Sequence, residues 1–154
     1  MQSAYIVSAK RSIVSPINGS LSSLPINELA APVINNAIEA SGINADAVDE
    51  LIVSNALGAG GNPARLIALS SNLPEKVAGL SIDRQCVGGL DAIMLGIKLV
   101  QSGSANVIVA GGVESYSNRP VRLAQAYDKI LVPYYTPNLR QIQMRKYIWR
   151  KLLI

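Results

Sequence analysis

The sequence contains no histidine and no phenylalanine, and it has one cysteine and one tryptophan among 154 residues. Without an imidazole, a serine triad cannot be assembled from this chain alone. With one thiol, no disulfide can form within the chain, which fits a reducing compartment, and we expect a cytoplasmic protein. The apolar runs are also shorter than the roughly 20 residues that span a bilayer. No membrane span is therefore expected, and the first residues show no secretory signal.

Charged residues are few, at 16%, while apolar residues make up 49%. These values favour a globular chain with a proper core, and the length favours one domain. Residues 1–132 hold 9 Lys and Arg against 10 Asp and Glu, whereas residues 133–154 hold 5 against none. Because the basic residues are concentrated at the end of the chain and not on a folded face, we expect no nucleic-acid partner.

Short β-branched runs alternate with helical patterns through the first two thirds of the chain. Buried strands rich in Val and Ile that alternate with helices indicate a mainly parallel sheet covered on both faces. The sequence therefore predicts an α/β fold of the order βαβαβαβ. The predicted strands cover residues 4–8, 51–54, 79–82 and 106–110, and the helices run from about Leu29 to Gly42, from Pro63 to Ser71 and from after Cys86 to Gly103.

The character of the chain changes beyond about Asp128. Five of the seven aromatic residues fall in the last 28 positions, and the strand and helix pattern stops. QIQMRKYIWRKLLI is compatible with a basic amphipathic helix that binds a membrane surface or a partner. The alternative is that this segment does not belong to the α/β fold that the preceding residues form.

The single thiol, Cys86, lies in DRQCVGGLDA, between a predicted strand and a predicted helix. At the amino end of a helix, the dipole and the free backbone N–H groups favour a thiolate, and such N–H groups also form oxyanion holes. This position suits a nucleophile in acyl transfer. A lone cysteine among apolar residues is also common as simple buried packing, and spacing alone leaves both interpretations open.

Several segments together resemble the thiolase family of acyltransferases. DRQCVGGLDAIMLG is similar to the active-site segment in which a cysteine opens a buried helix. AKRSIVSPINGSLSSLPINELA, VDELIVSNALGAGGNPAR and VIVAGGVESYSN are similar to the family's first strand and helix, second strand and fourth strand. Related condensing enzymes also place a cysteine at a helix start, but NPAR and GGVESYSN favour thiolase. The resemblance covers residues 4–119.

This resemblance implies that Cys86 is the catalytic nucleophile, which takes an acyl group from acyl-CoA as a thioester. The family's second half-reaction is a reversible Claisen condensation with acetyl-CoA, through ping-pong kinetics. The implied partners are acyl-CoA and acetyl-CoA. No metal and no bound organic cofactor is implied, since coenzyme A is part of the substrate, and no coenzyme A-binding residue of this chain is identified.

The sequence departs from the family in three ways. Val87, Gly88 and Gly89 stand where Gly-Ser-Gly is commonest, and the loop ALGAGGNPAR is shorter than usual. The third departure is that the family's activating histidine, its second cysteine, its coenzyme A-binding loop region and the second half of its fold all follow the region of resemblance. None of them has a counterpart in this chain.

We therefore expect residues 1–131 to be a partial thiolase N-terminal domain and residues 132–154 to be an unrelated basic, aromatic tail. A truncation, such as a frameshift, would produce this pattern, and a short protein with a dedicated binding tail is the alternative. As a lone chain it would be inactive, acting at most as an interaction module in a homo-oligomer or with a complete relative. The face that the family buries against its second half would be exposed.

Three further signals point to other chemistry and are disfavoured. Gly58 and Gly60 begin a G-x-G-x-x-G pattern, but Pro63 stands in place of its last glycine. The acidic group at residues 46–50 lacks the other ligands of a metal site and suits a solvated helix cap better. Glu114 and Ser115 resemble hydrolase residues only superficially, because no histidine can complete a triad.

Overall fold

A three-stranded parallel sheet lies at the centre of the structure, a computed structural model that describes residues 3–58 and 60–120. Its strands are β1 (Glu50–Ser54), β2 (Ala78–Ile82) and β3 (Ile108–Gly112), in the spatial order β2-β1-β3. The predicted α/β class with a parallel sheet is confirmed. The boundary predicted at residue 131 and the amphipathic helix predicted in the tail lie outside the described residues.

The three strands are in register from end to end. Glu50 of β1 is paired with Ala78 of β2 and with Ile108 of β3, and the pairing continues to the last residues. Because parallel strands run in one direction, their carboxyl ends meet at one edge of the sheet. Ser54, Ile82 and Gly112 therefore lie side by side at this carboxyl edge.

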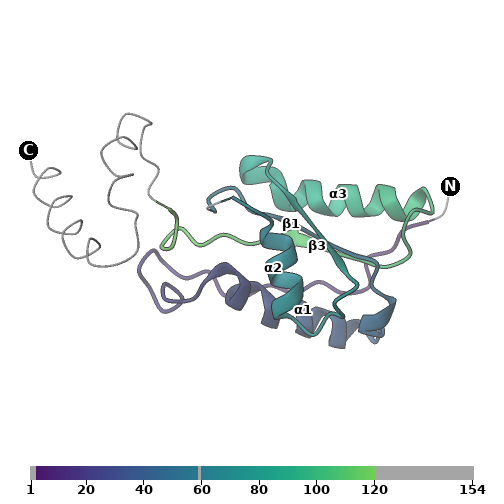
Figure 1. Ribbon diagram of the computed structural model, residues 1–154, viewed down its shortest axis with the longest axis horizontal. Coiled ribbons are helices and arrows are strands. Elements are labelled where there is room, and N and C mark those ends of the chain that lie inside the picture. Colours follow the sequence, from purple (N-terminus) through teal and green to yellow (C-terminus); the bar gives the residue numbers. More distant parts are fainter. Residues whose placement is uncertain (1–2, 59, 121–154) are drawn as a thin grey trace, which may run out of the picture. The chain divides into compact units, whose positions relative to one another are not determined.

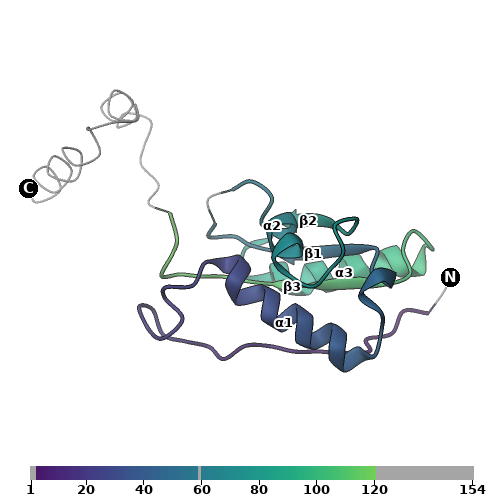
Figure 2. The same ribbon diagram turned by 60° about the horizontal axis from the view of Figure 1, so that its bottom comes forward.

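Helices cover both faces of the sheet, as the sequence predicted. In Figures 1 and 2, α3 (Gly88–Gln101) runs along one side, and α1 (Ile26–Ser41) and α2 (Pro63–Ser70) lie on the other. Side chains alternate between the faces of a strand. The face that carries Leu51 and Val53 packs against α1 and α2 in one apolar core, whose buried members are Ile34, Val48, Leu51, Val53, Ala64, Ile67, Ala68, Leu73 and Val77.

The ends of α1 and α2 follow from local sequence. Gly42 adopts φ 69°, the left-handed conformation in which helices commonly end, and its N–H donates to the Glu39 carbonyl. The Asn62 side chain accepts from the Arg65 N–H and caps α2, with Pro63 as its first residue. Both ends confirm the prediction, although α1 begins at Ile26, so that Pro32 lies in its interior. None of the helices in the described ranges has the length and apolarity that a membrane span requires.

Helix α3 contacts the sheet through its small residues. Gly88, Ala92 and Gly96, spaced four residues apart, are its buried positions. A Cβ on Gly96 would lie 3.2 Å from the Ile108 Cγ2 atom, so the helix and β3 approach closely. Two of the helix's large apolar residues lie outside this buried face, since Leu90 and Met94 are 63% and 46% exposed.

The prediction of a strand at residues 4–8 is wrong. These residues have no regular secondary structure, and Tyr5 is 81% exposed. Their β-branched sequence suits a strand, but a strand forms only when another chain segment pairs with it. In the described part of the chain, β2 and β3 are the edge strands of the sheet, and residues 4–8 make no backbone hydrogen bond with either of them.

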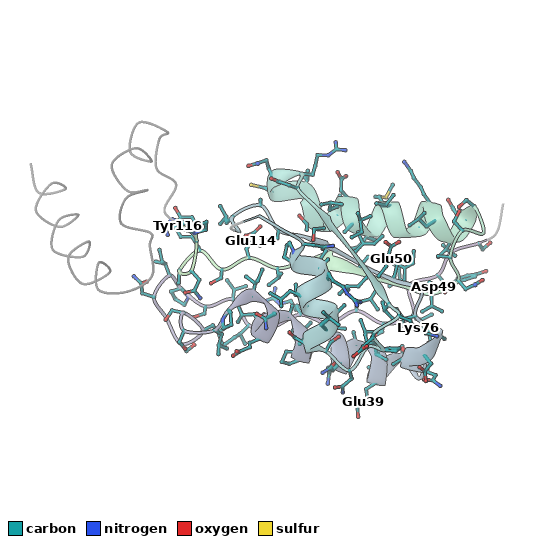
Figure 3. All side chains as sticks on the ribbon, in the orientation of Figure 1. Glu39, Asp49, Glu50, Lys76, Glu114 and Tyr116 are labelled. Carbon is teal, nitrogen blue, oxygen red and sulfur yellow. The ribbon has the colours of Figure 1, made fainter. Side chains whose placement is uncertain are left out.

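Strand β3 begins two residues later than predicted, because the residues before it bond to a side chain instead. The Asp49 carboxylate accepts hydrogen bonds from the N–H groups of Asn106 at 2.6 Å and Val107 at 3.1 Å. These bonds, with a smaller contribution from Lys76, hold the pKa of Asp49 below its usual value of 3.8. Figure 3 shows Asp49 and Lys76 at the same end of the molecule. The carboxylate thus fixes the turn that leads into β3 and is not a helix cap.

We predict that Asp49→Asn lowers the free energy of unfolding at pH 7 by about 0.5–1 kcal/mol, since the lost charge-assisted bonds are exposed. The lowered pKa means that the wild-type contribution is present above pH 3.8 and is lost as the pH falls through the folded-state value. Urea denaturation at several pH values measures this difference. A difference between wild type and variant that does not shrink at acidic pH contradicts the assignment.

Candidate active site

Cys86 is exposed and lies immediately before α3. It is the middle residue of the 3-10 turn η2 (Gln85–Val87), which runs directly into the helix at Gly88. The prediction that a helix begins just after the cysteine is confirmed, and the alternative of a buried packing thiol is wrong in this structure. An exposed thiol at the amino end of a 14-residue helix lies where the helix dipole favours negative charge.

Two close glycine contacts place the amino end of α3 on the carboxyl edge of the sheet. A Cβ on Gly88 would lie 1.8 Å from the Ser54 Oγ atom and 2.7 Å from its Cβ. Gly112 is similarly close to α3, since a Cβ built on it would lie 3.4 Å from the Gly89 Cα atom. The helix start is therefore seated on the last residues of β1 and β3. Ligands of open α/β sheets bind outside this edge, so Cys86 lies where a substrate is expected.

The turn before the thiol contains an unusual backbone conformation. Gln85 has φ 50°, and its N–H donates to the Asp83 Oδ1 atom at 2.9 Å. An ion pair joins this turn to α3: the Arg84 Nε atom lies 2.8 Å from the Asp91 Oδ2 atom. The backbone on both sides of Cys86 is thus held by side chains.

Glu114 joins the two loops that follow β1 and β3. Its carboxylate accepts hydrogen bonds from the backbone N–H groups of Ala56 and Leu57, the second at 3.1 Å, and from Asn55 Nδ2 at 3.2 Å. Asn55 Nδ2 also donates to the Val113 carbonyl at 2.9 Å. Figure 3 shows Glu114 well separated from Asp49, on the side of Tyr116. Glu114 therefore orders the carboxyl edge, and it is not part of a hydrolase site.

The last residues of the segment ALGAGGNPAR are bonded to β2 and to the residues that precede it. Asn62 Oδ1 accepts from Ser81 Oγ at 2.7 Å, and Asn62 Nδ2 donates to the Gly79 carbonyl at 2.8 Å. Arg65 Nη1 donates to the Val77 carbonyl at 2.7 Å and to the Glu75 carbonyl at 2.9 Å. The polar residues of NPAR are therefore used to anchor α2.

The acidic residues around β1 do not gather into a metal site. Within residues 3–58 and 60–120, no group of three Cys, Asp or Glu side chains lies close enough to hold an ion. Asp49 instead bonds to the backbone before β3, and Asn44 caps the short 3-10 turn η1 (Ala45–Ala47) by accepting from the Asp46 N–H. The acidic group at residues 46–50 therefore has local structural uses.

Comparison with known proteins assigns the family. The sequence model described as "Thiolase, N-terminal domain" matches residues 4–144. The chain belongs to the thiolase family. The match includes residues 132–144, part of the segment that the sequence analysis set apart as a tail, and the domain boundary at residue 131 stays a prediction.

The family assignment agrees with individual relatives. The acetyl-CoA acetyltransferase of Pseudomonas aeruginosa is 42% identical over 122 residues, which are 78% of this chain and 31% of that protein. The acetyl-CoA acetyltransferase of Escherichia coli is 40% identical over 145 residues, 85% of this chain and 37% of that one. The chain thus spans about a third of the length of the relatives that it matches.

Solved structures give the same correspondence for the fold. The acetyl-CoA acetyltransferase of Bacillus anthracis aligns with a TM-score of 0.76 at 34% identity, over 87% of this chain and 33% of that one. The Acat5 thiolase of Ascaris suum, solved in complex with coenzyme A, aligns with a TM-score of 0.77 at 33% identity, over 80% of this chain and 33% of that one. The described fold corresponds to one part of a thiolase.

The sequence predicts the thiol site but not the residues that hold its surroundings. It indicates no role for Asp83 or Asn55, and it presents Glu114 only as a hydrolase-like residue. For Asp83 a local signal existed, because Asp side chains often accept the N–H two residues later in a turn. For Glu114 none existed, since its partners lie 57 and 58 positions away.

We predict that Gly88→Ala destabilises the protein by about 1–3 kcal/mol, because the new Cβ overlaps Ser54 and the close-packed helix must move. Gly89→Ala is the matched control. The nearest heavy atom to its new Cβ is the Gly112 nitrogen at 3.9 Å, an ordinary contact. Urea denaturation of both variants measures the difference. Equal stabilities would show that the Gly88 contact does not fix the start of α3.

Proposed function

We propose that this chain is the N-terminal part of a thiolase-type acyltransferase and that Cys86 is its acyl-accepting nucleophile. The observation that carries the proposal is the exposed thiol before α3, at the carboxyl edge of the sheet, in a chain of the thiolase family. The relatives described as acetyl-CoA acetyltransferases support acetyl-CoA and other acyl-CoA thioesters as the substrates.

In the proposed first half-reaction, the Cys86 sulfur attacks the carbonyl carbon of an acyl-CoA. A new carbon–sulfur bond forms, the bond between the acyl carbon and the coenzyme A sulfur breaks, and the proton of the Cys86 thiol passes to the departing coenzyme A thiolate. In the second half-reaction, a base removes a proton from the methyl group of acetyl-CoA, and the resulting carbanion forms a carbon–carbon bond with the acyl carbon. The bond from that carbon to the Cys86 sulfur breaks, a 3-oxoacyl-CoA is released, and the proton returns to the Cys86 thiolate. This chemistry belongs to lipid metabolism, and coenzyme A enters only as part of the substrates.

The environment of Cys86 favours the first of these steps. Negative charge on sulfur is stabilised at the amino end of a helix, and an acyl group on Cys86 would lie beside the backbone N–H groups of the helix start. Val87, which stands where the family most often has glycine, is 56% exposed next to the thiol. We propose that its branched side chain restricts the acyl groups that reach Cys86.

The second half-reaction needs groups that this chain does not supply. A base must remove a proton from acetyl-CoA, and the 154 residues contain no histidine and no second cysteine. The chain also spans about a third of its relatives. We therefore propose a truncated form that accepts an acyl group but does not turn over as a lone chain, in a reducing, cytoplasmic compartment.

We predict that incubation with acetyl-CoA adds one acetyl group to the chain and that Cys86→Ser abolishes this addition. Intact-mass spectrometry detects the product, and hydroxylamine, which cleaves thioesters, should remove it. Thiolysis of a 3-oxoacyl-CoA, followed by loss of the substrate absorbance, should not exceed the rate with Cys86→Ser. Absence of any adduct contradicts the role of Cys86, whereas sustained turnover contradicts the proposed incompleteness.

A second candidate is an interaction module that pairs through its apolar surface. Val87 just before α3 and Leu90 and Met94 on α3 are exposed, and Tyr5, Ile6 and Val7 add exposed apolar area near the amino end. Monomeric soluble proteins rarely leave large contiguous apolar patches exposed, and such patches commonly mark interaction surfaces. We propose self-association, or pairing with a complete relative, as the way in which this surface becomes covered.

We predict that the purified chain is an oligomer in size-exclusion chromatography with light scattering. Leu90→Lys combined with Met94→Lys should shift the distribution toward monomer, because two charges cannot be buried without partners. Lys98→Glu is the control, since it changes charge at a position of α3 that is already polar and exposed. A wild-type monomer across the concentration range contradicts the association.

A further inference from the structure

The backbone immediately before Cys86 is held in a conformation that its sequence does not favour. Gln85 has φ 50°, and among the described residues the only other non-glycine residue with positive φ is Asn18. Asparagine tolerates this left-handed region, because its short polar side chain bonds to nearby backbone, whereas glutamine gains no such benefit. Something outside Gln85 must therefore stabilise the turn.

The contact that does so comes from Asp83. Its Oδ1 atom accepts the Gln85 backbone N–H at 2.9 Å and lies 3.5 Å from the Gln85 Nε2 atom. These bonds close a turn over residues 83–85. On the other side, the pair of Arg84 with Asp91 ties the turn to the first part of α3. The chain direction at Cys86 therefore depends on how Gln85 is held.

We propose that Asp83 is a positioning residue for Cys86, whose carboxylate holds Gln85 in the left-handed conformation that presents the thiol at the amino end of α3. This inference rests on the proposed role of Cys86 as nucleophile. It also predicts that the charge of Asp83 disfavours the reaction, because this carboxylate lies three residues before a sulfur that must become negative. Asparagine at position 83 would retain the oxygen acceptor and remove the charge.

The other charged groups around the turn are already engaged. Arg84 and Asp91 pair with each other, and the Glu114 carboxylate on the loop after β3 accepts the N–H groups of Ala56 and Leu57. The chain has no histidine that would titrate near neutral pH. Within this turn, Asp83→Asn therefore removes one charge, keeps the shape of the side chain and leaves the ion pair of Arg84 with Asp91 intact.

The experiment is alkylation of Cys86 by iodoacetamide as a function of pH, which reports one site because the chain has one cysteine. At low ionic strength, Asp83→Asn should react about two- to threefold faster than wild type at neutral pH. Asp83→Ala also removes the charge, but it should react about fivefold or more slowly than Asp83→Asn because the turn is no longer held.

A rescue separates positioning from charge. Gln85→Gly introduced into Asp83→Ala gives a residue that adopts positive φ without strain, so the double variant should regain the Asp83→Asn rate to within about twofold. Hydrogen exchange gives an independent readout: the amide of residue 85 should exchange faster in Asp83→Ala than in Asp83→Asn. Circular dichroism of each variant verifies the fold, which exposed positions 83 and 85 should not disturb.

Equal alkylation rates for Asp83→Asn and Asp83→Ala would overturn the proposal. It would also be overturned if the double variant Asp83→Ala, Gln85→Gly reacted as slowly as Asp83→Ala. If Asp83→Ala fails to fold, the double variant still tests the proposal, because it is expected to fold and to be alkylated at the rate of Asp83→Asn. A double variant that does neither contradicts the proposal. Iodoacetamide requires no acyl-CoA. A chain that is never acetylated but shows these alkylation differences would refute the proposed function of Cys86 while leaving the positioning role of Asp83 supported.

Discussion

The close approach of α3 to the ends of β1 and β3 determines where the thiol of this protein lies. Gly88 has no room for a side chain beside Ser54, and Gly89 and Gly112 bring the backbones of helix and strand together. Protein interiors are close-packed, so a helix seated in this way has little freedom to shift along the sheet. Cys86 lies two residues before Gly88, so the contact of Gly88 with Ser54 also fixes the position of the turn that carries the thiol.

The surroundings of the thiol are built by polar groups that join distant parts of the chain. Glu114 links the loops after β1 and β3, Asn62 and Arg65 attach α2 to β2, and Asp49 fixes the entry to β3. Each satisfies backbone groups that the sheet leaves unpaired where the strands begin or end. The chemistry proposed for Cys86 depends on this ordered edge, because an acyl-accepting thiol must be held in one geometry.

The same structure shows what the chain leaves uncovered. The buried residues of α3 are small, Leu90 and Met94 remain exposed, and Tyr5, Ile6 and Val7 lie exposed without a strand neighbour in the described part of the chain. Both features agree with a chain that spans about a third of its relatives. The absence of a base for the second half-reaction and the exposed apolar surface therefore have the same proposed cause, which is that this chain corresponds to only part of a thiolase.

The sequence by itself determined the α/β class, the parallel sheet, the caps of α1 and α2 and the helix that begins after Cys86. These features depend on local patterns such as β-branched runs, Asn-Pro and a terminal glycine. The tertiary structure alone decided which predicted strands pair, which face of α3 is buried, and how Glu114 is used. Strand pairing and side-chain bonds between distant loops depend on which segments meet in space, and residues 4–8 show that a strand-like sequence without a partner remains unpaired.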